Sequence, residues 1–149
     1  MRMLLAAAAA ALMSASCNAP PAEPKVEVEN AWVQLPVMPR RPGAAYFTLR
    51  SNNDPTKLVG VSSPRVERIE LHGTMMEGNM ARMRPLENLV FPDDLKLAFT
   101  PGGKHAMLFG IDPNVKTGDK IALTFTFEPM APVTVEAEVR AFGQDHGAH

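Results

Sequence analysis

Hydrophobic and polar residues alternate along most of this chain in short runs, and turn-forming residues separate the runs. Residues 120–128 (KIALTFTFE) and 133–142 (VTVEAEVRAF) each place their apolar side chains on one face and their polar ones on the other. This period of two predicts half-buried β-strands, and residues 129–132 (PMAP) predict a hairpin connection between them. Further strands are expected at residues 26–35, 43–51, 56–63, 65–72, 94–100 and 105–111.

So many short strands, in a sequence that has no segment with a helical period, predict an all-β domain of antiparallel strands, built as a sandwich or a Greek-key barrel. The domain would span residues 26–142 and leave a short tail at 143–149. Its core is expected to include Trp32, Tyr46 and Phe47, because large aromatic side chains contribute most when buried. Cys17 is the one cysteine of the chain, so no disulfide framework supports this core.

Residues 1–17 have the composition of an export signal. Arg2 precedes an apolar stretch from Met3 to Met13, which is too short to span a bilayer as a permanent helix. Cys17 stands where bacterial lipoproteins are acylated, although Ser14 occupies a place where that motif usually has leucine. Cleavage after Ala19 would instead release a soluble protein. With an acylated Cys17, the proline-rich residues 18–25 would tether the domain to a membrane.

The charge balance argues against a nucleic-acid partner. The chain has 15 basic and 16 acidic residues, and removal of the signal with Arg2 leaves 14 basic ones, a net charge near −2. Binding to nucleic acid needs a concentrated basic face. Contact with a membrane is expected only through a lipid anchor at Cys17.

Histidine and methionine gather in two segments of the domain. In the strand at 105–111, His105 and Met107 point to the same side, because residues i and i+2 share a face. His72 ends the strand at 65–72 on its polar side, and Gly73 is expected to open a loop that carries Met75, Met76, Met80 and Met83. Methionine alone is more often packing than ligand, but two histidines and several methionines at strand ends of one exported domain favour a metal site.

The ligand types select the metal. Thioethers are soft, neutral donors that favour Cu(I), and imidazole suits copper of either valence. Zinc would prefer thiolate, imidazole or carboxylate ligands, and calcium would need a loop of carboxylates. A set of two histidines and two methionines therefore predicts Cu(I), in a site without the activated water of a catalytic metal. We expect a binding protein and not an enzyme.

The spacing of four residues resembles the signature of the PCuAC-type periplasmic copper chaperones: His72, ten residues, Met83, twenty-one residues, His105, one residue, Met107. The segments GAAYFTLRSNN, LVGVSSP, IELHGTMMEGNMARMRPLENL and LAFTPGGKHAMLFGI are similar to that family as well. The resemblance implies a cupredoxin-like β-sandwich in the periplasm that binds one Cu(I) through those four residues. It also implies delivery of copper towards cytochrome c oxidase, with the CuA subunit or a Sco-type protein as partner.

Two departures from the family pattern concern extra ligands. Gly73 stands where some members have a methionine, and the tail GQDHGAH is shorter than the His- and Met-rich tails of some relatives. His146 and His149 in this tail could bind Cu(II) weakly.

Other functions stay open at this stage. The same site could buffer excess copper or confer resistance without a dedicated recipient. A β-sandwich adhesion or scaffold module could use the methionines for partner contacts alone. Redox catalysis is disfavoured, because the mature domain offers no cysteine for a blue-copper ligand set.

Overall fold

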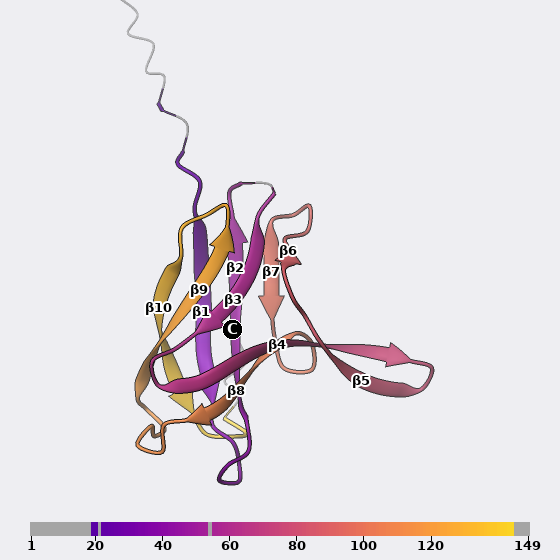
Figure 1. The fold of residues 1–149 in the computed structure, drawn as a ribbon, viewed down its shortest axis with the longest axis vertical. Helices are drawn as coiled ribbons and strands as arrows, with labels where there is room; N and C mark the ends of the chain where they lie inside the picture. Colours follow the sequence, from indigo (N-terminus) through magenta and orange to yellow (C-terminus); the bar gives the residue numbers. More distant parts are fainter. Residues whose placement is uncertain (1–18, 21, 54, 145–149) are drawn as a thin grey trace, which may run out of the picture.

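Ten strands form a single sheet in the computed structural model (Figure 1), which describes residues 19–20, 22–53 and 55–144. The strand order is β5-β4-β8-β2-β1-β10-β9-β3-β6, and β7 also pairs with β2. The all-β prediction is confirmed. In this part of the chain, no helix has the length and hydropathy needed to cross a membrane. The strands are β1 (Val26–Gln34), β2 (Gly43–Ser51), β3 (Lys57–Ser62), β4 (Val66–Glu77), β5 (Met80–Pro85), β6 (Leu89–Val90), β7 (Lys96–Phe99), β8 (His105–Ile111), β9 (Lys120–Glu128) and β10 (Val133–Arg140).

The two strictly alternating segments form the pair β9 and β10. They pair antiparallel from Val133 opposite Phe125 to Glu138 opposite Lys120, with residues 129–132 as the connection. Along β9 the alternate apolar side chains from Ile121 to Phe127 are buried. The predicted hairpin is therefore confirmed, because a single buried face fixes the register of both strands.

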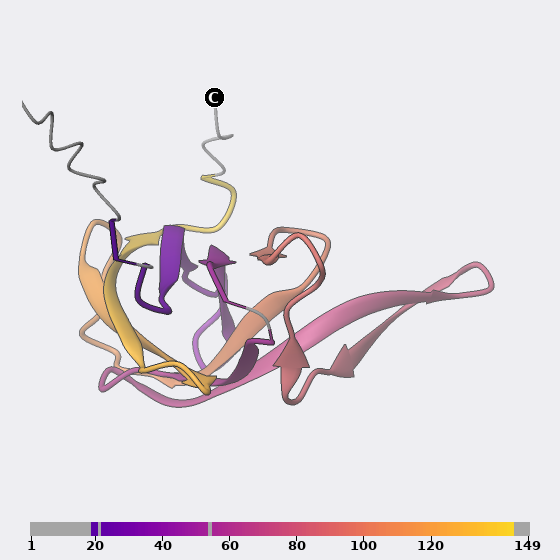
Figure 2. The ribbon, with the colours of Figure 1, turned by 90° about the horizontal axis from the view of Figure 1, so that it is seen from above.

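The first and last strands lie side by side in parallel, with Trp32 opposite Glu138. This pair departs from the purely antiparallel arrangement expected from the short runs. The β1–β10 pairing places the first and last strands of the domain side by side, and the sheet curves around one core (Figures 1 and 2). Phe47 is central to that core, with ring centroids 4.5 Å from Phe99 and 4.7 Å from Phe125.

Trp32 and Tyr46 differ from the core position predicted for them. Both are only half-buried, and they pair with each other at a centroid distance of 4.7 Å. The guanidinium of Arg140 lies 4.9 Å above the Trp32 ring. The aromatic pair therefore covers the outer side of the sheet.

The predicted loop after His72 is a β-hairpin instead. Strand β4 continues through Gly73 to Glu77, and the chain turns at Gly78, whose φ of 63° suits a tight two-residue hairpin turn. Gly73 is buried, and a Cβ added there would lie 3.3 Å from Leu86. The outer half of β4 and all of β5 project from the body as a two-stranded arm, which Figure 2 shows from above.

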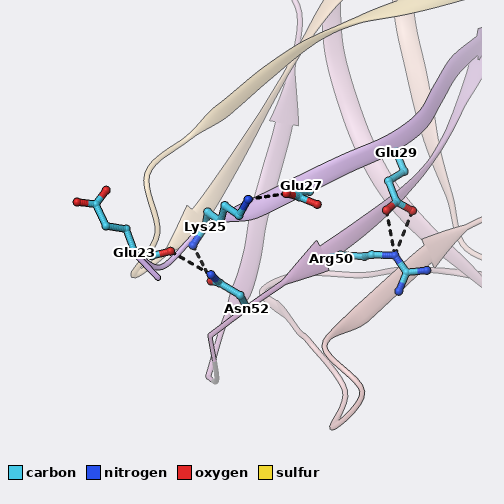
Figure 3. A network of polar contacts seen from close by, with 6 residues as sticks. All are labelled: Glu23, Lys25, Glu27, Glu29, Arg50 and Asn52. Atoms are coloured by element: carbon cyan, nitrogen blue, oxygen red, sulfur yellow. Dashed lines mark hydrogen bonds and ion pairs between the residues drawn. The ribbon is translucent and has the colours of Figure 1, made fainter. Parts of the chain in front are cut away.

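The segment before β1 is fixed to the end of β2 (Figure 3). The backbone N–H of Lys25 donates to the side chain of Asn52 at 2.7 Å, and Asn52 donates to the carbonyl of Glu23 at 3.0 Å. Nearby, Arg50 donates to both carboxylate oxygens of Glu29 at 3.1 Å. Residues 23–25, which belong to the predicted linker, thus hydrogen-bond to the folded domain.

Candidate metal centre

Three neighbouring strands, β5, β4 and β8, bring the four predicted ligands to one face. His72 of β4 lies directly opposite His105 of β8, and Met107 lies opposite Glu70. Met83 of β5 lies opposite Thr74. Directly opposed residues share a face of the sheet, and so do residues two apart in one strand. His72, Met83, His105 and Met107 therefore all point to the same side.

The two histidine rings are stacked, with centroids 6.1 Å apart and planes inclined by 22°. Only 16% of the His72 side chain is exposed, and His105 is half-buried. The Nδ1 of His105 lies 2.9 Å from the carbonyl oxygen of Gly103. Because a carbonyl only accepts, Nδ1 carries the proton and Nε2 keeps a free lone pair for a metal.

The methionines separate into two faces of the arm. Met83 is 59% exposed and lies diagonally across from His72, a relationship that places two residues roughly 7–8 Å apart and their Cβ atoms somewhat closer. Met76 is on the same face but two residues nearer the tip. Met75 and Met80 lie on the opposite face, because they pair with Arg82 and Glu77 respectively. Because the sequence predicted a loop here, it could not assign these methionines to one face or the other.

Glu70 belongs to this face as well, and the sequence analysis did not single it out. Its Oε2 lies 3.1 Å from Nε2 of His72, and its Oε1 lies 2.7 Å from Nε of Arg68. The hydrogen bond from His72, assisted by the charge of Arg68, lowers the pKa of Glu70 below its usual value. The signal that could have identified it is its position two residues before His72, on the same side of the strand.

The chemistry of the face depends on methionine. Among the residues that the structure describes, no three His, Cys, Asp or Glu side chains form a group that could hold a metal ion. A metal bound at His72 and His105 would need ligands of another kind, and thioethers lie on the same face. The other expected copper ligands, His146 and His149, lie outside the described residues, as do Cys17 and the predicted signal at 1–17.

Known proteins match nearly the whole domain. The family model described as "Putative lipoprotein LpqE-like" covers residues 26–139. Protein RP573 of Rickettsia prowazekii is 27% identical over 124 residues, which are 80% of this chain and 68% of that protein. The family match therefore includes every strand that carries a predicted ligand.

Solved structures share the fold. The solution structure of apo-DR1885 from Deinococcus radiodurans is 30% identical, covers 95% of this chain and 93% of that chain, and has a TM-score of 0.58. DR1885 has also been solved with Cu(I). The copper-bound PCuAC domain from PmoF2 is 24% identical, covers 78% of this chain and 93% of that chain, and has a TM-score of 0.65. This chain thus has the cupredoxin-like fold of the PCuAC domains, and it belongs to the LpqE-like family.

Proposed function

We propose that this protein is an exported copper chaperone that binds one Cu(I) through His72, Met83, His105 and Met107. The observation that carries the proposal is the register of β5, β4 and β8, which turns these four side chains to one face with the imidazoles stacked 6.1 Å apart. The similar protein DR1885 was solved with Cu(I), which supports the choice of ion. Two thioethers and two neutral imidazoles suit a soft monovalent cation.

The position of the ligands suits transfer of the ion. His72 and His105 lie where the arm leaves the body, whereas Met83 lies on the exposed strand β5. A partner could replace the exposed thioether first, while the two more buried imidazoles still hold the ion. Stepwise exchange of this kind keeps copper out of solution during transfer. The function is thus binding and delivery, and we assign no catalytic step.

Delivery would take place outside the cytoplasm. The predicted signal at residues 1–17 and the family's description as lipoproteins support export with a lipid anchor at Cys17. We propose the CuA subunit of cytochrome c oxidase or a Sco-type protein as the recipient. A deletion strain separates this from copper buffering: loss of oxidase activity under low copper indicates delivery, whereas sensitivity to high copper alone indicates buffering.

Metal competition tests the binding function itself. The mature domain should bind one Cu(I) per chain much more tightly than Zn(II), because thioethers contribute little to binding of the harder ion. Chromogenic chelators specific for each metal give both affinities. Equal or tighter binding of Zn(II) would reject the proposed site.

A further inference from the structure

We propose that Glu70 is a positioning residue of the copper site, which holds the His72 ring through Nε2 and offsets the charge of the bound ion. The inference rests on the proposed function, because it concerns the same site. It assigns a role to a residue outside the four proposed ligands.

The contact between Glu70 and His72 determines which ring nitrogen can bind copper. Oε2 of Glu70 lies 3.1 Å from Nε2 of His72. A carboxylate accepts hydrogen bonds, so the proton of a neutral His72 resides on Nε2 and the lone pair on Nδ1. His105 has the opposite arrangement, since Gly103 binds its Nδ1. Each histidine thus has one nitrogen held by the protein and the other free for metal.

Glu70 is itself held by neighbours on the same face. Its second oxygen, Oε1, accepts from Nε of Arg68 at 2.7 Å. The guanidinium of Arg68 lies 4.4 Å from the centroid of the Phe109 ring, and the two residues are directly opposed across β4 and β8. Phe109, Arg68, Glu70 and His72 therefore form a continuous row. Such outer partners fix the ring orientation of a ligating histidine and raise its basicity.

Charge gives Glu70 a second effect. The four proposed ligands are neutral, so Cu(I) would leave the site with an uncompensated positive charge. Glu70 lies opposite Met107 and beside His72, and its carboxylate, which also pairs with Arg68, is an anion in hydrogen-bond contact with a proposed ligand. Nearby opposite charges attract more strongly at a partly buried site than in bulk water.

Three variants separate positioning from charge. Glu70→Leu should lower the Cu(I) affinity about 10- to 100-fold, the usual effect of removing an outer partner. Glu70→Gln should lose less, because its amide oxygen still accepts from His72 although it carries no charge. Glu67→Gln is the matched control, because Glu67 is exposed on the same strand, five residues from His72, and its carboxylate lies over Gly110. It should leave the affinity within about twofold of wild type. The proposal is overturned if Glu70→Leu binds copper as wild type does, or if Glu67→Gln loses as much.

NMR of the copper-free protein tests the contact without relying on metal binding. Long-range proton–nitrogen spectra should show the His72 proton on Nε2 in the wild type, and exchange of this proton with water should be at least about tenfold faster in Glu70→Leu. A proton on Nδ1, or equal exchange in both proteins, contradicts the inference. If the wild-type protein bound no Cu(I) at all, the proposed function would be wrong. The same spectra would still show whether Glu70 holds the His72 proton.

Discussion

Replacing Met83 by leucine separates a copper ligand from an exposed hydrophobic residue. Leucine keeps a side chain of similar volume and removes the sulfur donor. Met83 is 59% exposed, so the free energy of unfolding should change by less than about 0.5 kcal/mol. A change in copper binding would therefore reflect the missing thioether and not a disturbed fold.

The register sets the size of the expected effect and supplies the controls. Met83 opposes Thr74, two residues from His72, whereas Met76 is four residues from His72 along β4. At roughly 3.4 Å per residue these offsets along the strand direction are about 7 Å and 14 Å, and Met83 is displaced further by one strand spacing of about 4.8 Å. Met83 can share an ion with His72, and Met76 is too distant for the same geometry. We expect Met83→Leu to weaken Cu(I) binding at least tenfold, which is about 1.4 kcal/mol.

Competition with a chromogenic Cu(I) chelator measures this loss. Met80→Leu is the closest control, because Met80 is similarly exposed on the same strand but points to the opposite face. It should bind Cu(I) as wild type does, and Met76→Leu should lose less than Met83→Leu. An unchanged affinity in Met83→Leu together with a loss in Met80→Leu would refute the assignment of ligands to this face.

Three further predictions concern pH and stability. Cu(I) affinity should weaken on acidification, because each imidazole must lose its proton to bind the metal. Chelator competition should give a limiting slope approaching two protons per copper in the wild type and about one in His105→Met, and a flat wild-type curve would exclude histidine ligands. Leu108→Ala removes a fully buried side chain that directly follows the proposed ligand Met107 in β8, so denaturant unfolding should show a loss of about 2–5 kcal/mol. A loss below about 1 kcal/mol would mean that this part of the core is loosely packed. The backbone N–H of Asn114, which donates to Asp112, and the charge of Arg65 lower the pKa of Asp112 from its ordinary 3.8, so the ionised carboxylate stabilises the fold above that pH and this contribution is lost as pH falls through the lower folded-state pKa. Asp112→Asn should therefore lower the free energy of unfolding at pH 7 and make it depend less on acid pH, and parallel pH profiles of the two proteins would contradict this prediction.

The strands that could be predicted from sequence are those with one buried face. The predicted limits of β2 and β8 agree with the structure, and the alternation of β9 and β10 predicted both their faces and their hairpin. Strand β5 could not be found in this way, because all six of its residues are exposed and impose no period. The parallel pairing of β1 with β10 joins segments about a hundred residues apart, and local patterns contain no information on such a contact.

The candidate site was predictable in residue type but not in arrangement. The sequence placed His105 and Met107 on one face of a strand, and the structure agrees with that placement. The pairing of His72 with His105 depends on the register between β4 and β8, which only the folded sheet supplies. Assigning Met83 and Met80 to opposite faces required knowing that the arm is a hairpin. Glu70 was missed although it lies two residues before His72, because only the structure shows that its carboxylate reaches the His72 ring.

X-ray absorption at the copper edge of the Cu(I)-loaded protein tests the central claim most directly, because it counts the atoms bound to the metal. We predict two sulfur and two nitrogen neighbours for the wild type, and one sulfur fewer in Met83→Leu. A shell of sulfur atoms alone would mean that the methionines of the arm hold the ion without His72 and His105. A shell without sulfur, or an unchanged shell in Met83→Leu, would contradict the proposed site.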